Sequence, residues 1–242
     1  MKRRALTATL TALHEVNTLD DIDTILSGIC KNYSLAHVAF LLIRHGINPL
    51  RFPLHLTTYP LLWQNQYIRN DYFEIDPVVV AGKASLLAFD WSELNWLSPA
   101  ARKLRNEARA MDLGRHGLSI PIRGTQGERS LFSVTSNLSL AQWRRWQETT
   151  LGDLHILCQH VHNMVLTVSG LRASSIPRPL SRRELQCLQL LARGLISKQI
   201  ASRLDISESA VRIYLRSARR KLRANTAYQA IAKAAFLEII EA

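Results

Sequence analysis

The feature that most limits how this chain folds is a proline-containing break late in the sequence, ASSIPRPLS at residues 173–181. Helical periodicity ends before this segment, and a new helical pattern begins after it. Proline, and the residue before a proline, disfavour helix, so no single helix can run through the break. We therefore expect an N-terminal domain at residues 1–172, a linker at 173–179 and a second domain at 180–242. A chain of 242 residues is long enough for both.

The chain carries a marked excess of basic residues. Lysine and arginine number 31 against 19 aspartate and glutamate residues, which gives a formal charge of +12 at pH 7. Of these, 12 basic and 5 acidic residues follow Arg178, so the short second domain holds most of the excess. Such a surplus favours either a nucleic acid or an acidic membrane surface as partner, and charge alone does not choose between them.

Two further features indicate the setting in which the protein works. No segment approaches the roughly 20 apolar residues that a membrane-spanning helix requires. The three cysteines match neither a disulfide framework nor a zinc-binding spacing: Cys30, Cys158 and Cys187. We therefore expect a cytoplasmic protein that works without a membrane, a metal or a cofactor.

The second domain opens with a pattern of short helices. Ser181 and Glu184 form a capping box at the start of the first helix, and Gly194 is suited to end it. A second helix fits residues 197–206, and Ser207 can cap a third over residues 207–222. Two short helices and a tight turn predict a helix-turn-helix.

The third helix carries an apolar stripe beside an arginine stripe. The apolar residues are Val211, Leu215, Ala218 and Leu222, and the arginines one position later are Arg212, Arg216, Arg219 and Arg223. Because a guanidinium can donate two hydrogen bonds to guanine, we expect Arg212 and Arg216 to read bases. The remaining expected contacts, to phosphates, are Lys198, Ser207, Arg219, Arg220, Lys221 and Arg223. The alternative is an arginine stripe that is only a solvated helix face.

Residues 180–240 resemble the DNA-binding domain of the LuxR family of bacterial transcription factors. The matching positions are Glu184, Leu188, Gly194, Ile200, Ala201, Leu204, Ile206, Ser207, Val211, Lys221, Leu222 and Ala230. The resemblance implies a fourth helix that helps to pair two such domains through a small-residue face, formed here by Ala227, Ala230, Ile231 and Ala234. It also implies a homodimer on two-fold symmetric double-stranded DNA, with RNA polymerase as a further partner. Leu195, Ala210 and Tyr214 depart from the common pattern, which puts one phosphate contact and part of the site preference in doubt.

The N-terminal domain alternates helical and strand-like segments. Helical patterns cover residues 5–16, 20–33, 99–111 and 138–171, whereas residues 37–45, 115–123 and 128–136 have the composition of buried strands. We expect an α/β/α sandwich with a central antiparallel sheet. With the helical second domain, the predicted fold class is α+β.

Residues 57–80, followed by Trp91, resemble the acyl-homoserine-lactone-binding domain of the quorum-sensing branch of the same family. The residues at the family's spacing are Tyr59, Trp63, Tyr67, Asp76, Pro77, Trp91, Gly117 and Ser133. The resemblance implies that Trp63 donates to the lactone carbonyl and that Asp76 accepts from the amide N–H. It further implies that Tyr59 and Ser133 donate to the amide carbonyl, while Tyr67 and Trp91 wall the pocket. The expected ligand is an N-acyl-homoserine lactone, bound as a signal.

Particular residues argue against several other functions. A phosphorylated receiver is disfavoured because Asp20, Asp21 and Asp23 lie at a helix start, where carboxylates serve as caps. A metal site or lactone-degrading enzyme would need more than His155, Cys158, His160 and His162, which lack the remaining metal ligands. No nucleophile elbow, phosphate-binding loop or dinucleotide motif is present, so we expect no enzyme. An orphan regulator that binds another small molecule, or that binds DNA without ligand, stays open, as does a purely structural adaptor.

Overall fold

The structure is a computed structural model that describes residues 2–45, 48–125, 127–171 and 179–240. The chain separates into two compact units, whose bulk lies in residues 1–170 and 171–242. Most of the expected linker, residues 173–178, lies outside the described residues. In the described part, no helix is both long and apolar enough to cross a membrane.

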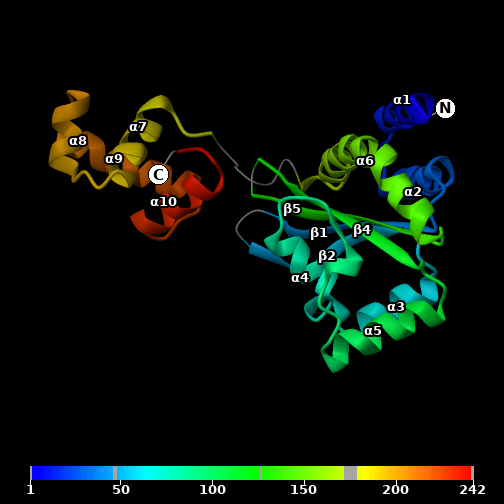
Figure 1. Cartoon of the computed structure of the whole chain (residues 1–242). Helices are drawn as coiled ribbons and strands as arrows, with labels where there is room; N and C mark the ends of the chain where they lie inside the picture. Colours follow the sequence, from blue (N-terminus) through cyan, green and yellow to red (C-terminus); the bar gives the residue numbers. More distant parts are fainter. Residues whose placement is uncertain (1, 46–47, 126, 172–178, 241–242) are drawn as a thin grey trace. The chain divides into compact units, whose positions relative to one another are not determined.

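The first unit is built on a five-stranded sheet within the described residues, with strand order β2-β1-β5-β4-β3 (Figure 1). Antiparallel ladders join β5 to β1 and to β4, with His37 opposite Thr135 and His116 opposite Ser136. The strands are β1 His37–His45, β2 Asn48–Thr57, β3 Phe89–Asp90, β4 His116–Arg123 and β5 Arg129–Ser136. The antiparallel sheet is thereby confirmed.

Neither β2 nor β3 was predicted from the sequence. Pro49 and Pro53 interrupt the β2 pattern, and proline is unfavourable inside a sheet because it cannot donate to the ladder. However, β2 lies at the edge of the sheet, where one side needs no partner. β3 has only two residues and is therefore too short for alternation to reveal.

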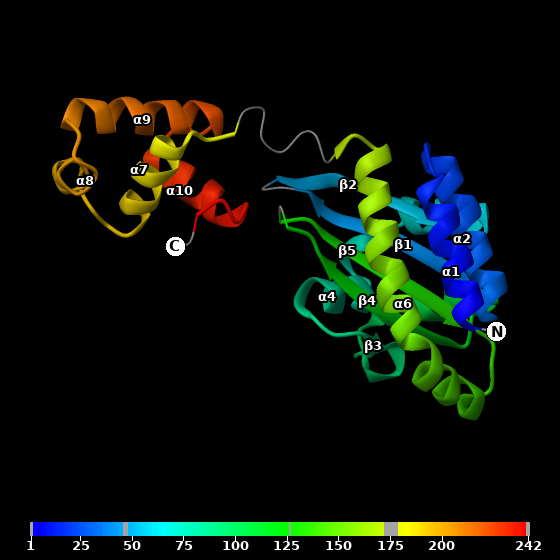
Figure 2. The same cartoon turned by 90° about the horizontal axis from the view of Figure 1, so that it is seen from above.

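Helices cover both faces of this sheet (Figures 1 and 2). One layer consists of α1 Lys2–His14, α2 Leu19–Tyr33 and α6 Leu140–Val168; the other contains α3 Leu61–Arg69, α4 Pro77–Ala84 and α5 Pro99–Ala110. Capping boxes at Thr18 and Ser139 start α2 and α6. The α6 helix buries Trp143, Leu154 and Val161 against the sheet side, where hydrophobic burial stabilises the layer. This arrangement confirms the α/β/α sandwich.

The second unit is helical, with α7 Arg182–Ala192, α8 Ser197–Leu204, α9 Glu208–Lys221 and α10 Ala227–Phe236. One buried cluster joins α7, α8 and α9 through Cys187, Ile200 and Val211. A second joins α7 to α10 through Leu188 and Ala230. The expected helix-turn-helix and fourth helix are found. However, Ala230 and Ala234 of α10 are fully buried against Leu188 and Leu222 of the same unit, so these two residues are not available to pair two such domains. The overall class is α+β, as predicted.

Candidate functional site

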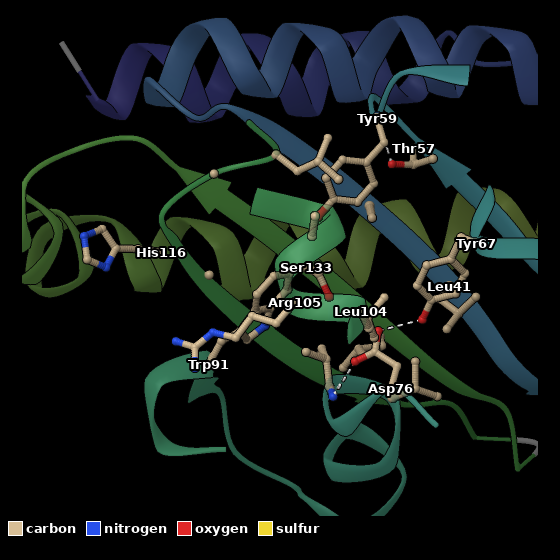
Figure 3. A pocket seen from close by; sticks show the side chains of 18 of the residues that line it. Leu41, Thr57, Tyr59, Tyr67, Asp76, Trp91, Leu104, Arg105, His116 and Ser133 are labelled. Carbon is tan, nitrogen blue, oxygen red and sulfur yellow. Dashed lines mark hydrogen bonds between the residues drawn. The ribbon is translucent and has the colours of Figure 1, made fainter. Parts of the chain in front are cut away.

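The first unit contains a cavity of about 590 Å³. Its lining comes from β1, β5 and the helical layer of α3, α4 and α5, together with the segment around Trp91 (Figure 3). Six of the seven residues predicted to contact a ligand line it: Tyr59, Trp63, Tyr67, Asp76, Trp91 and Ser133. Pro77 is not among the lining residues and instead begins α4, where its fixed φ suits the first helical turn.

Asp76 is held in the cavity wall as a hydrogen-bond acceptor. Its Oδ1 accepts the backbone N–H of Val78 at 2.8 Å, which caps α4, and its Oδ2 accepts the hydroxyl of Tyr67 at 2.6 Å. Burial raises the pKa of Asp76 to about 6, although both hydrogen bonds act to lower it. The carboxyl group is therefore ionised at neutral pH yet only weakly solvated.

Aromatic rings surround this carboxylate. Tyr67 packs edge-on against Phe73 and Trp63, with ring centroids 4.8 Å and 6.0 Å away. Burial and the charge of Asp76 raise the pKa values of both Tyr59 and Tyr67. Both phenols therefore remain protonated and able to donate hydrogen bonds at physiological pH.

Trp63 differs from the other tryptophans of the cavity wall. Its side chain is 4% exposed and packs with Tyr72, Leu104 and Leu113. Within the described residues its indole N–H donates to no protein acceptor, whereas Trp96 donates to the carbonyl of Trp91 at 2.9 Å. A buried indole normally finds an acceptor, so this N–H is available to a bound molecule.

A hydrogen-bonded chain leads from Trp91 to Ser133. The Trp91 indole donates to Ser119 Oγ at 2.8 Å, and Ser119 Oγ lies 2.7 Å from Ser133 Oγ. The Trp91 ring rests on the backbone of Gly117, where even a β-carbon would overlap it. Ser119 was not predicted from the sequence, because its contact with Trp91 depends on the pairing of β3 with β4, which sets Phe89 opposite Ser119.

The histidines and cysteine of α6 are engaged outside the cavity. His162 Nδ1 lies 2.9 Å from Ser130 Oγ, and His155 Nδ1 lies 2.8 Å from the carbonyl of Leu151. The thiol of Cys158 donates to the carbonyl of His155 at 3.2 Å, and burial raises its pKa to about 12. Across the described ranges, no group of three or more His, Cys, Asp or Glu residues is placed to hold a metal ion.

The second unit presents the expected basic surface on α9 and α8. Arg212, Arg216, Arg220 and Lys198 are exposed. Arg212 forms an ion pair at 3.4 Å with Glu208 one turn earlier, which an incoming phosphate or base could replace. Ile213 is 64% exposed beside Arg212 and Arg216, a position that the sequence analysis overlooked. Ile213 is not part of the apolar stripe of α9, and this position in the sequence could have indicated that its side chain is exposed.

Three of the expected phosphate-contacting groups have structural partners. Ser207 Oγ caps α9 by accepting from Ala210 N at 3.1 Å. Arg219 is half-buried and donates to the carbonyl of Asn225, which ties it to the loop before α10. Lys221 pairs with the buried carboxylate of Glu184 at 2.7 Å. The DNA contacts of these three residues remain predictions. Arg216 and Arg220 are exposed, whereas Arg212 and Arg219 have protein partners.

Comparisons with known proteins agree with both halves of this description. A model of the autoinducer binding domain matches residues 18–165, and one of the luxR family of bacterial regulatory proteins matches residues 178–234. The transcriptional activator RaiR of Rhizobium etli is 50% identical over 171 residues, 70% of each chain. VanR of Vibrio anguillarum, also a transcriptional activator, is 28% identical over 231 residues, 91% of each chain.

Solved structures show the same fold at low sequence identity. SdiA of Escherichia coli aligns with a TM-score of 0.72 at 19% identity, covering 98% of each chain. CepR2 of Burkholderia cenocepacia aligns with a TM-score of 0.58 at 15% identity, over 70% of this chain and 98% of that one. The chain therefore belongs to the LuxR family of quorum-sensing transcriptional regulators, proteins that join an autoinducer-binding domain to a helix-turn-helix DNA-binding domain and are not enzymes.

Proposed function

We propose that the cavity binds an N-acyl-homoserine lactone and that a dimer of the ligand-bound chain binds promoter DNA. The observation that carries the ligand proposal is the meeting of a fixed acceptor, Asp76, and a free donor, the Trp63 indole, in one aromatic cavity of about 590 Å³. Cavities of this size suit small organic ligands. The solved CepR2 is named as dependent on N-acylhomoserine lactone.

The ligand's polar groups match the cavity one by one. The amide N–H can donate to Asp76, because each carboxylate oxygen has a second lone pair beyond those used by Tyr67 and Val78. The indole of Trp63 can donate to the lactone carbonyl. The Tyr59 hydroxyl lies in the same wall and can donate to the amide carbonyl.

Ser133, which lies beside Ser119, can supply a second hydrogen-bond donor for the amide carbonyl. Ser119 is fully buried and accepts from Trp91, so its own proton needs an acceptor, and Ser133 Oγ is 2.7 Å away. When Ser119 donates to Ser133, the proton of Ser133 is left for the ligand. Trp91 and Ser119 are positioning residues in this arrangement. The acyl tail would lie among apolar lining residues, including Leu41, Phe73, Val79 and Leu131.

Ligand binding would stabilise the sensor unit, since a ligand that binds only the native state adds to its free energy of unfolding. Dimerisation would then present two α9 helices to successive major grooves of a two-fold operator. Cytoplasmic location and transcriptional activation through RNA polymerase complete the proposal. The exposed arginines of α9 support the DNA step.

The deciding experiment is a melting-temperature series of the purified chain with N-acyl-homoserine lactones from short to long tails. A rise that depends on tail length, and that vanishes in Asp76→Ala but persists in Asp23→Asn on α2, supports the proposal. Light scattering with the best lactone measures the dimer. A lactone series without any shift would reject the ligand assignment and favour an orphan regulator. SdiA has been solved with octanoyl-rac-glycerol, so this glyceride serves as the probe for a different signal.

A further inference from the structure

Arg105 is an unusual residue for an aromatic cavity. It lies on α5, is half-buried and lines the same cavity as Trp63 and Asp76. Its guanidinium carbon lies 5.3 Å from the ring centroid of Trp96. No hydrogen bond or ion pair to another described residue accompanies this cation–π contact, so the donors of the guanidinium are open to a bound molecule.

The cavity's carboxylates do not neutralise Arg105. Asp76 is bonded to Tyr67 and Val78, and Asp90 accepts from Trp143 and Gln147 at 2.7 Å and 2.6 Å. Glu93 lines the cavity but is exposed and forms no ion pair with a described residue. Three more arginines lie along the lining: Arg109, Arg115 and Arg144. Burial, together with the charge of Arg109, lowers the pKa of Arg105, which is the direction expected for a cation without a counter-ion.

Trp96 links Arg105 to the part of the cavity that contains Trp63. Its ring packs between two clusters, that of Trp63, Tyr72, Leu104 and Leu113 and that of Leu41, Val78, Val79 and Leu131. In Figure 3 the Arg105 side chain extends toward the Trp91 side of the cavity, away from Tyr67. In the proposed binding mode the lactone ring lies beside Trp63, and Arg105 adjoins Trp63 through the Trp96 ring and its neighbour Leu104.

We propose that Arg105 binds an oxygen of the ligand's head group and lets the cavity accept the ring-opened N-acyl-homoserine carboxylate as well as the lactone. This inference rests on the proposed function. Addition of water to the ester carbonyl and cleavage of the ring C–O bond give a carboxylate, a hydroxyl and a released proton, while amide and tail are unchanged. Asp76 can still accept the amide N–H, and the guanidinium of Arg105 can pair with the new carboxylate in a bidentate manner.

A neutral lining would exclude the acid, because a carboxylate that leaves water without a partner is strongly destabilised. Asp76 opposes its binding by like-charge repulsion, so the acid must place its carboxylate at the Trp96 end. The regulator would then respond to total signal, opened and closed, rather than to the lactone alone.

The test is calorimetric titration of the full chain near neutral pH with the best lactone of the melting series and with the same compound after alkaline ring opening. We expect the acid to bind within roughly tenfold of the lactone. Arg105→Met keeps a long apolar side chain over Trp96 and should weaken acid binding by about tenfold or more, with a smaller loss for the lactone. Arg102→Met, an exposed change on the same helix and outside the cavity lining, is the control and should alter neither.

The possible outcomes distinguish the role of Arg105 from the proposal that the cavity binds an N-acyl-homoserine lactone. A chain that binds the lactone but not the acid overturns the role of Arg105 and leaves the proposed function intact. Equal losses for both ligands in Arg105→Met likewise overturn it. A chain that binds neither compound rejects both proposals. The comparison of the two ligands on the unaltered chain needs no variant, so a folding defect in Arg105→Met cannot obscure the result.

Discussion

The Tyr67 hydroxyl donates a 2.6 Å hydrogen bond to Oδ2 of Asp76, and thereby stabilises the ionised form of this carboxyl group in the aromatic cavity. Tyr67→Phe removes this donor and leaves the ring in place. The pKa of Asp76 should rise further above its value of about 6, because one of the two bonds that lower it is lost. The pH at which lactone binding is half-lost should move upward by about one unit.

Calorimetric affinity measured across pH 5–8 checks this shift. Tyr72→Phe is the matched control, since the Tyr72 hydroxyl donates to Glu107 and not to Asp76. A midpoint unchanged in Tyr67→Phe would show that this hydrogen bond does not set the charge state of the site.

In the unaltered chain, both the stability of the fold and the affinity for the lactone should depend on pH. The folded-state pKa of Asp76 is raised above the ordinary 3.8, so the folded chain holds this proton more tightly than the unfolded chain does. Without ligand, this carboxyl group therefore makes the fold less stable as pH rises from about 4 to about 6. Lactone binding should show the opposite trend, because a protonated Asp76 is a poorer acceptor for the amide N–H. Affinity should fall up to about tenfold per pH unit below the pKa, and a flat profile would exclude Asp76 as the ligand's acceptor.

Gly117 is required by the ring that covers it. A β-carbon at this position would overlap the Trp91 ring, so Gly117→Ala should displace the indole from Ser119 and disturb the serine pair. We expect loss of the lactone-induced rise in melting temperature. Gly152→Ala is the control, because a β-carbon there meets no atom within 4 Å and alanine favours helix by about 0.5–1 kcal/mol. A normal lactone response in Gly117→Ala would mean that Trp91 is not a positioning residue.

Local patterns predicted most helices and the three inner strands, because amphipathic periodicity, capping boxes and runs of β-branched residues act over a few neighbouring residues. The edge strand β2 escaped because its two prolines contradict the strand pattern, and only its position in the sheet makes them tolerable. The number of strands was therefore underestimated even though the fold class was predicted.

The cavity was partly predictable for a related reason. The segment from Tyr59 to Asp76 is nearly continuous in sequence, so its spacing carried the resemblance. Ser119 and Arg105 are far from that segment. Ser119 lies behind the wall, where the pairing of β3 with β4 brings it to Trp91, and Arg105 lines the cavity because α5 packs there. Such residues carry no local sequence signal, since tertiary contacts alone bring them to the site.

The ion pair between Glu184 and Lys221 should be important for the stability of the DNA-binding unit. Glu184 also accepts from the backbone N–H of Ser181 at 2.6 Å. Burial raises the pKa of Glu184, but the hydrogen bonds from Lys221, Ser217 and Ser181 together outweigh burial and lower this pKa to about 2. Glu184→Gln leaves a half-buried ammonium group without its counter-charge and should cost about 2–4 kcal/mol. The exposed pair of Glu208 and Arg212 provides the control, since Glu208→Gln should cost under about 1 kcal/mol.

Hydrogen exchange of α7 and α9 in the full chain measures this loss. All five tryptophans precede the proline-containing break, so tryptophan fluorescence reports the first unit separately. Because the folded-state pKa of Glu184 is depressed, its contribution should be present above about pH 4.5 and be lost as pH falls toward about 2. Equal exchange in the two variants would contradict a stabilising role for the buried pair.

The exposed arginines of α9 should divide into two functional groups. Arg216 lies closer to the start of the helix, where base edges are within reach, so Arg216→Ala should cost about 1–3 kcal/mol on the selected operator and less on unrelated DNA. Arg220 lies one turn later and should contact phosphate, so Arg220→Ala should weaken binding to all sequences evenly. It should also reduce the slope of log K against log salt by about 1.

Fluorescence anisotropy with an operator selected from random DNA, over a range of salt concentrations, distinguishes the two effects. Arg145→Ala, an exposed change on α6 that removes the same charge from the first unit, should leave both affinity and salt slope unchanged. If Arg216→Ala weakened operator and unrelated DNA by the same factor, Arg216 would be a phosphate contact, and sequence recognition would have to come from neighbours such as Arg212 or the exposed Ile213.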